Sequence, residues 1–131
     1  MVACLSAEHP RVLVVDDEPL LRMFNVDLLS DAGFDVIEAG DAEEALRLLT
    51  DVAGIRVVFT DVEMPGRIDG FELAELVEAQ WPEIGVVVTS GRRLPDEAFR
   101  SSARCFVPKP YAAAQVVELI DAFVHGEQAR H

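Results

Sequence analysis

The chain has 131 residues, half of them hydrophobic, and a formal net charge of −13. This length accommodates one domain with a full core, and so high a hydrophobic share argues against disorder. The negative charge disfavours binding to nucleic acid or to an anionic membrane. No apolar run approaches the roughly 20 residues of a membrane span, and no secretory signal precedes the first predicted strand. Two cysteines make no disulfide framework, so we expect a reduced, cytoplasmic setting.

Strand and helix signals alternate along the chain. Short apolar runs predict five strands, at residues 12–15, 35–38, 57–60, 84–89 and 105–108. Helical patterns separate these runs and follow the last one, including a short, weakly patterned segment at residues 96–101. This alternation predicts an α/β fold with a parallel sheet, and the handedness rule places helices on both of its faces.

The first two helices have clear start signals. Pro19 fits the first turn of a helix that presents Leu21, Phe24 and Leu28 on one apolar face and ends near Gly33. Asp41 is expected to cap the next helix, with Glu44 as its capping-box partner.

Apolar stripes define the inward faces of the later helices. We expect these faces to carry Ala45, Leu48 and Leu49 in the second helix; Leu73, Leu76 and Val77 in the helix over 71–79; and Val116, Val117, Ile120, Phe123 and Val124 in the last.

Three of the predicted strands end in charged residues. Asp16 and Asp17 follow the first strand, Asp61 follows the third, and Lys109 follows the fifth. Lys109 is the only lysine, because the other ten basic residues are arginine. The carboxyl ends of parallel strands converge on one crevice where ligands bind. We therefore expect three carboxylates and one ammonium to meet there.

Simpler roles exist for each of these residues. Asp16 and Asp17 could be helix caps, and a lysine is usually on the surface. Asp61 is harder to explain as a cap, because no helix signal follows it. Converging carboxylates repel one another and raise each other's pKa, and a hard divalent cation such as Mg²⁺ relieves this. Ser90 ends the fourth strand, where its hydroxyl could serve the same site, although serine followed by Gly91 also fits a plain turn.

With these motifs in place, the chain resembles the receiver domains of two-component response regulators. The matching stretches are Val14–Pro19, Asp61–Gly66 through Asp69–Gly70, Thr89–Gly91 and Phe106–Tyr111. They stand in the family's order and spacing and cover nearly the whole chain. The resemblance implies a flavodoxin-like, doubly wound (βα)5 fold with strand order 2-1-3-4-5. It also implies a cis peptide bond between Lys109 and Pro110.

The resemblance implies a role for each site residue. Asp61 would accept a phosphoryl group, while Asp17, Asp61 and the backbone carbonyl of Glu63 would bind Mg²⁺ and Asp16 would assist through water. Lys109 would pair first with Asp61 and then with a phosphoryl oxygen. Ser90 would hydrogen-bond the phosphoryl group, and Phe106 would be the switch aromatic that turns inward.

Some features depart from the family's commonest form. Arg67 and Ile68 lengthen the loop before Asp69 by one residue, and Thr89 is an alternative to Ser90 as the switch hydroxyl. A phenylalanine in place of tyrosine at 106 offers no phenol to partners. Four arginines gather over thirteen positions and form either a solvated face or a docking edge for an acidic partner: Arg92, Arg93, Arg100 and Arg104.

We expect a stand-alone receiver domain spanning residues 1–131, with its core at about 11–125 and no output domain. It would take phosphate from a histidine kinase or a histidine phosphotransfer protein and change a binding surface for a downstream protein. It would phosphorylate and dephosphorylate itself without being a turnover enzyme. One alternative is a Mg²⁺-dependent phosphohydrolase with an aspartyl-phosphate intermediate, but Glu63 fits badly as the second carboxylate that such an enzyme needs. The other is a flavodoxin-like FMN binder, but Asp16 and Asp17 would repel the phosphate of FMN.

Overall fold

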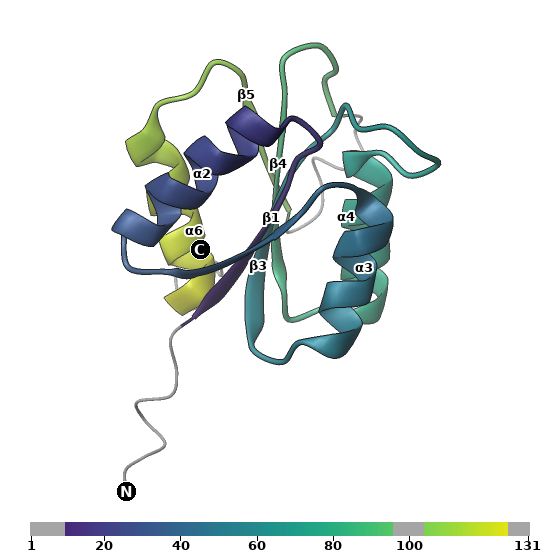
Figure 1. Cartoon of the computed structure of the whole chain (residues 1–131), viewed down its shortest axis with the longest axis horizontal. Helices are drawn as coiled ribbons and strands as arrows, with labels where there is room; N and C mark the ends of the chain where they lie inside the picture. Colours follow the sequence, from purple (N-terminus) through teal and green to yellow (C-terminus); the bar gives the residue numbers. More distant parts are fainter. Residues whose placement is uncertain (1–9, 96–103, 126–131) are drawn as a thin grey trace, which may run out of the picture.

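The structure is a computed structural model that describes residues 10–95 and 104–125 (Figure 1). Five parallel strands form one sheet in the order β2-β1-β3-β4-β5. The strands are β1 (Arg11–Val15), β2 (Asp35–Ala39), β3 (Ile55–Asp61), β4 (Gly85–Ser90) and β5 (Cys105–Pro108). This confirms the predicted flavodoxin-like fold and its strand order.

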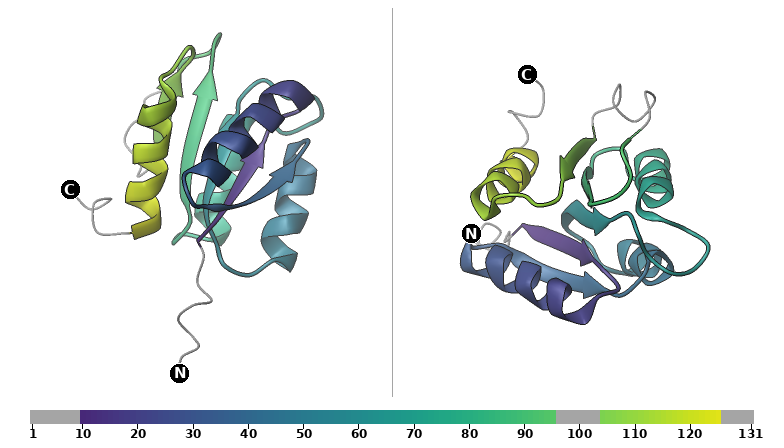
Figure 2. Two further views of the ribbon diagram at one scale, coloured as in Figure 1. Left: turned by 60° about the vertical axis from the view of Figure 1, so that its left-hand side comes forward. Right: turned by 90° about the horizontal axis from the view of Figure 1, so that it is seen from above.

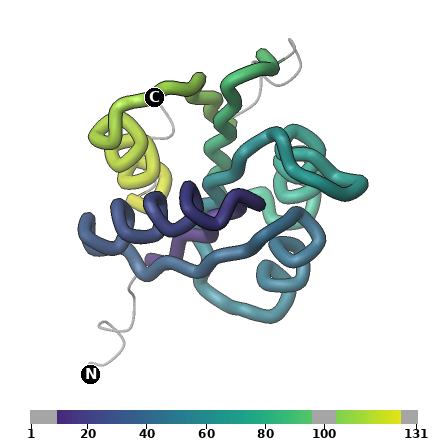
Figure 3. Tube along the Cα trace, turned by 45° about the horizontal axis from the view of Figure 1, so that its top comes forward, coloured from purple at the N-terminus to yellow at the C-terminus, as the bar shows by residue number. Residues whose placement is uncertain are grey.

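Four helices lie within the described residues: α2 (Pro19–Asp31), α3 (Ala42–Asp51), α4 (Gly70–Gln80) and α6 (Ala113–His125). The short helix predicted at residues 96–101 falls outside the described part of the chain. Helices α3 and α4 cover one face of the sheet and α2 and α6 the other (Figures 1 and 2). The same division is visible along the Cα trace in Figure 3. No helix in these ranges has both the length and the apolar character that crossing a bilayer requires.

Each face of the sheet has its own hydrophobic core, because successive strand residues point to opposite faces. Leu13, Val58 and Val88 pack on the α3/α4 side. Val12, Phe59 and Val87 pack on the α2/α6 side. Burial on both faces explains why these strands read as continuous apolar runs in the sequence.

The inward face of α2 differs from the prediction. Pro19 opens the helix as expected, but its buried residues are Asn25 and Leu29. Leu21 is 45% exposed and Phe24 58% exposed, while Leu28 is only partly buried. The prediction counted apolar residues alone, whereas the buried amide of Asn25 accepts a hydrogen bond from the Tyr111 hydroxyl at 3.3 Å.

The capping prediction for α3 is half right. Asp41 is its N-cap and accepts a hydrogen bond from the backbone N–H of Glu44. Glu44 does not return the bond to Asp41, because its carboxylate accepts from the N–H of Gly40 instead. The reciprocal capping box lies in α4, where Asp69 and Glu72 each accept the other's backbone N–H at 2.9 Å.

The inward faces of the other helices agree with the predicted stripes. The fully buried members are Ala45 and Leu49 in α3, Leu73 and Val77 in α4, and Val116, Ile120 and Val124 in α6. The remaining predicted members, Leu48, Leu76, Val117 and Phe123, are half-buried.

Gly70 holds the start of α4 against the end of β3. A Cβ atom at Gly70 would lie 2.3 Å from the carbonyl oxygen of Asp61 and 2.7 Å from the Cα of Val62, both backbone atoms. We expect Gly70→Ala to lower the free energy of unfolding by about 1–3 kcal/mol through this overlap, measured by urea denaturation. Gly91→Ala is the matched control, because its Cβ would meet Lys109 at an ordinary 3.7 Å. Equal stability of the two variants would show that α4 can move away from β3 at little energetic cost.

Candidate functional site

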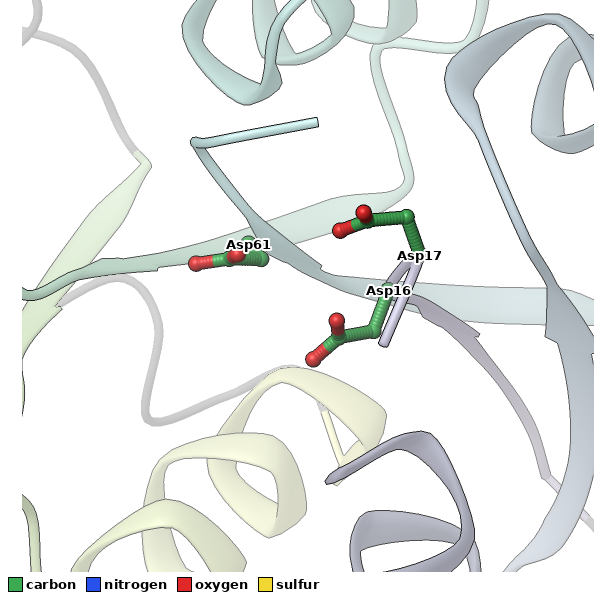
Figure 4. A group of neighbouring side chains, drawn as sticks. All are labelled: Asp16, Asp17 and Asp61. Atoms are coloured by element: carbon green, nitrogen blue, oxygen red, sulfur yellow. The ribbon is translucent and has the colours of Figure 1, made fainter. Parts of the chain in front are cut away.

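The structure brings together the three aspartates that end β1 and β3. One carboxylate oxygen from each of Asp16, Asp17 and Asp61 lies within 4.8 Å of the others (Figure 4). Asp16 and Asp61 are buried and Asp17 is exposed. The predicted convergence at the carboxyl end of the sheet is therefore observed.

Backbone hydrogen bonds hold the two strand ends in place. The N–H of Asp16 donates to the carbonyl of Ala39 at 3.1 Å, and a carboxylate oxygen of Asp16 accepts from the N–H of Glu18 at 2.9 Å. Beyond Asp61, the N–H of Val62 donates to the carbonyl of Thr89 at 3.0 Å. The carboxylates thus extend from backbone that neighbouring strands fix.

Lys109 is the cation of this cluster. Its Nζ lies 3.1 Å from Oδ1 of Asp61 as an ion pair, and its backbone N–H donates to the carbonyl of Ser90 at 3.0 Å. The peptide bond between Lys109 and Pro110 is cis, which confirms that prediction. Oδ1 of Asp61 is buried and accepts no well-aligned hydrogen bond within the described part of the chain. That oxygen has capacity left for a further cationic partner.

The charges of the site are unbalanced. Burial raises the pKa of Asp61 above its ordinary value, against the opposing effect of Lys109, and the charge of Glu63 adds to the increase. Burial likewise raises the pKa of Asp16, with a contribution from the charge of Asp61. For Lys109, burial alone would lower the pKa, but the ion pair with Asp61 and the charge of Asp16 outweigh it and the pKa rises. The ammonium is held charged, yet it offsets only one of three carboxylates.

The two candidate switch hydroxyls differ in their contacts. Ser90 Oγ donates to the Glu63 carboxylate at 2.5 Å. The hydroxyl of Thr89 is buried and has no hydrogen-bond partner among the described residues. Phe106 is half-buried, and its ring stacks on that of Phe71 with centroids 6.2 Å apart.

The predicted arginine cluster does not form one exposed edge. Arg104 has a side chain only 9% exposed and pairs with Glu78 at 3.1 Å. Arg93 pairs with Asp69 and lies over the ring of Phe71, 5.7 Å from its centroid. Arg92 is exposed, and Arg100 lies outside the described residues. Two of the four arginines therefore form ion pairs with carboxylates of the same chain.

Sequence reasoning missed a polar pair beside Lys109. The Tyr111 hydroxyl donates to Asn25 on α2, and the Tyr111 ring meets Phe59 edge-on at 6.0 Å. These contacts anchor the turn that carries Lys109 to α2 and to the core. The available signal was an asparagine between Phe24 and Val26 in the middle of α2, which a count of hydrophobic residues passes over.

A cavity of about 440 Å³ lies next to the acidic cluster. Its walls include Asp16 and Lys109 on the polar side and Leu21, Phe24 and Pro110 on the apolar side. The exposed side chains of α2 thus border the charged site directly.

Comparison with known proteins places this geometry in one family. The family model of the response regulator receiver domain matches residues 12–121. The transcriptional regulatory protein PdtaR of Mycobacterium tuberculosis is 32% identical over 122 residues, which are 91% of this chain and 58% of that protein. The chain belongs to the response regulator receiver domain family.

Solved receiver structures agree with this assignment. The receiver domain of NtrX from Brucella abortus superposes with a TM-score of 0.78 at 33% identity, covering 88% of this chain and 99% of that one. TrrA from Thermotoga maritima, solved in complex with Mg²⁺ and BeF, gives a TM-score of 0.73 at 27% identity, covering 87% and 98%. The chain spans 25%, 35% and 58% of the length of three curated relatives.

The raised pKa of Asp16 sets a pH dependence of stability. A folded-state pKa above the unfolded value means that the native state binds more protons in that range, so the charged carboxylate destabilises the fold at neutral pH. Asp16→Asn keeps an acceptor for the N–H of Glu18 and removes the charge. In metal-free buffer we expect this variant to be more stable than wild type at pH 7, with an advantage that shrinks as the pH falls toward 4. Urea denaturation at several pH values measures it, and a constant difference would contradict the assigned direction.

Proposed function

We propose that the chain is a phosphoacceptor module that takes a phosphoryl group onto Asp61 from a histidine kinase or a histidine phosphotransfer protein. The observation that carries this proposal is the buried Asp61 carboxylate paired with Lys109 beside Asp16 and Asp17. The module signals by changing its surface. The carboxylate of Glu63 is hydrogen-bonded to Ser90, which supports a signalling role over a phosphohydrolase that would need this group as an acid or base.

The chemistry is a single in-line displacement. A carboxylate oxygen of Asp61 attacks phosphorus, the P–N bond of a phosphohistidine breaks, and its electron pair returns to the imidazole. The Lys109 ammonium neutralises Asp61 before the attack and pairs with a phosphoryl oxygen afterwards. The Ser90 hydroxyl donates a hydrogen bond to a phosphoryl oxygen, and Phe106 repacks as the loop after β4 moves inward. The protein supplies position and charge for this transfer.

The acidic cluster fits Mg²⁺. Two buried carboxylates with raised pKa suit a hard cation that takes one or two carboxylates, waters and phosphate oxygens, and only one of the two is paired with Lys109. Asp17, Asp61 and the backbone carbonyl of Glu63 would hold it directly, and Asp16 through water. When bound, the ion neutralises charge that develops on the phosphoryl oxygens.

We expect acetyl phosphate with Mg²⁺ to add one phosphoryl group to the wild-type chain and none to Asp61→Asn, as measured by intact mass. The control is Asp41→Asn, because Asp41 caps α3 and asparagine caps a helix equally well. Labelling that persists in Asp61→Asn would overturn the assignment of the acceptor.

Binding of Mg²⁺ should stabilise the native state. A ligand at 100 times its dissociation constant adds about 2.7 kcal/mol, which raises the melting temperature of a domain this size by several degrees. We expect this increase in wild type, beyond that from NaCl of equal ionic strength, and little of it in Asp17→Asn. Without metal, Asp17→Asn should melt above wild type because one like charge is gone. A full Mg²⁺ response in the variant would show that Asp17 is not a ligand.

The exposed apolar side of α2 is the proposed docking face for the phosphodonor protein. Leu20, Leu21, Met23 and Phe24 are 45–74% exposed, and two of them line the cavity that reaches Lys109. A patch of this kind marks an interaction site, and its position leads a partner to the acceptor.

We expect Phe24→Ala to slow phosphoryl transfer from a purified phosphohistidine protein about tenfold, as for an interface hot spot. The rate with acetyl phosphate should be unchanged, since this donor needs no docking face. Glu75→Ala removes an exposed side chain on α4, which covers the other face of the sheet, and serves as the control. An equal loss with both donors would place the defect in the chemistry instead.

A further inference from the structure

The hydroxyl of Ser90 has its whole hydrogen-bonding capacity engaged. It donates to Oε2 of Glu63 at 2.5 Å and accepts from the backbone N–H groups of Arg92 at 3.1 Å and Arg93 at 2.9 Å. A hydroxyl has one proton to donate and two lone pairs to accept with. Ser90 is 3% exposed, so water does not compete freely for these bonds. Its single proton is therefore committed to Glu63.

A second contact joins the same two segments of the chain. The guanidinium of Arg93, in the loop after β4, pairs with Asp69, the N-cap of α4. The same guanidinium lies over Phe71, whose ring stacks on Phe106. The loop after β4 is thus fastened to the β3–α4 segment at two points, and one of them is the Ser90–Glu63 bond.

We propose that the Glu63 carboxylate is a built-in competitor for the Ser90 proton, which latches the loop after β4 in its unphosphorylated position. The proposal rests on the proposed function, in which the Ser90 hydroxyl donates its hydrogen bond to the phosphoryl group on Asp61. Both acceptors are anionic and only one proton is available. Phosphorylation must therefore break the Glu63 bond before the loop can close.

The latch has a predictable strength. A hydrogen bond to a charged acceptor in a partly buried site contributes more than one to a neutral acceptor. When this bond breaks, hydration of the freed Glu63 carboxylate offsets part of the lost stabilisation. We therefore expect removal of the latch to tighten binding of a phosphoryl mimic about tenfold, which corresponds to 1.4 kcal/mol. The equilibrium shifts because the mimic binds the released state better than the latched one.

The test is a double-mutant cycle on the full chain, with the affinity for beryllofluoride in excess Mg²⁺ measured by ¹⁹F NMR titration. We expect Glu63→Ala to tighten binding about tenfold in the wild-type background and to have little effect in a Ser90→Ala background. In a Thr89→Val background, which removes the neighbouring unpartnered hydroxyl, the gain should persist. Glu63→Gln keeps the side-chain shape with a weaker acceptor and should give a smaller gain.

If Glu63→Ala raises the affinity for beryllofluoride equally with and without Ser90, the proposal is overturned. The Glu63 carboxylate would then act only by repelling the anionic mimic. Loss of the gain in Thr89→Val overturns the proposal as well, since the coupled hydroxyl is then Thr89. If wild type binds no beryllofluoride, the proposed function itself fails.

A second measurement separates these failures, because it needs no mimic. Amide hydrogen exchange at Arg92 and Arg93 should accelerate in Glu63→Ala, since their acceptor is no longer held. Glu75→Ala, which removes an exposed carboxylate on α4, should leave it unchanged. Unchanged exchange in Glu63→Ala overturns the latch whatever the mimic does.

Discussion

The ion pair between Lys109 and Asp61 is the interaction on which the site depends. Two buried carboxylates and one exposed carboxylate share the carboxyl end of the sheet, and the ammonium contacts one of them, Asp61. Burying a charge without a partner is costly, so the cluster persists only because the rest of the fold enforces it. The pKa values of Asp16 and Asp61 are raised because burial disfavours the charged form of each carboxylate. The proposed Mg²⁺ ion would supply the positive charge that this site lacks.

The packing around the Lys109–Asp61 pair holds the like-charged carboxylates close together. Alternate residues of the central strands are buried on both faces of the sheet, which leaves the strand ends little freedom to move apart. Gly70 lets α4 approach the backbone of Asp61, and the Asn25–Tyr111 bond fixes the turn that bears Lys109. These contacts come from three different elements, so no local sequence motif contains the site.

The strands and the convergence of the charged residues followed from the sequence, because buried parallel strands leave continuous apolar runs and their carboxyl ends lie at one edge of the sheet. The strand order followed only from the resemblance to receiver domains. The inward face of α2 did not follow. Asn25 is buried through a tertiary hydrogen bond to Tyr111, 86 residues away, and Phe24 is exposed although it is apolar. The bond between Ser90 and Glu63 could not be predicted either, because it joins the end of β4 to the loop after β3, and only the folded chain defines how these two side chains lie. Arg104 looked like part of a basic face, yet it pairs with Glu78.

A crystal structure of the chain with Mg²⁺ and beryllofluoride would test the central claim most directly, because it locates both the cation and the phosphoryl mimic. The account predicts beryllium on a carboxylate oxygen of Asp61, the metal against Asp17, Asp61 and the carbonyl of Glu63, and the Lys109 ammonium against a fluoride. A mimic bound to another side chain, or a cation that leaves the three aspartates uncontacted, would contradict it.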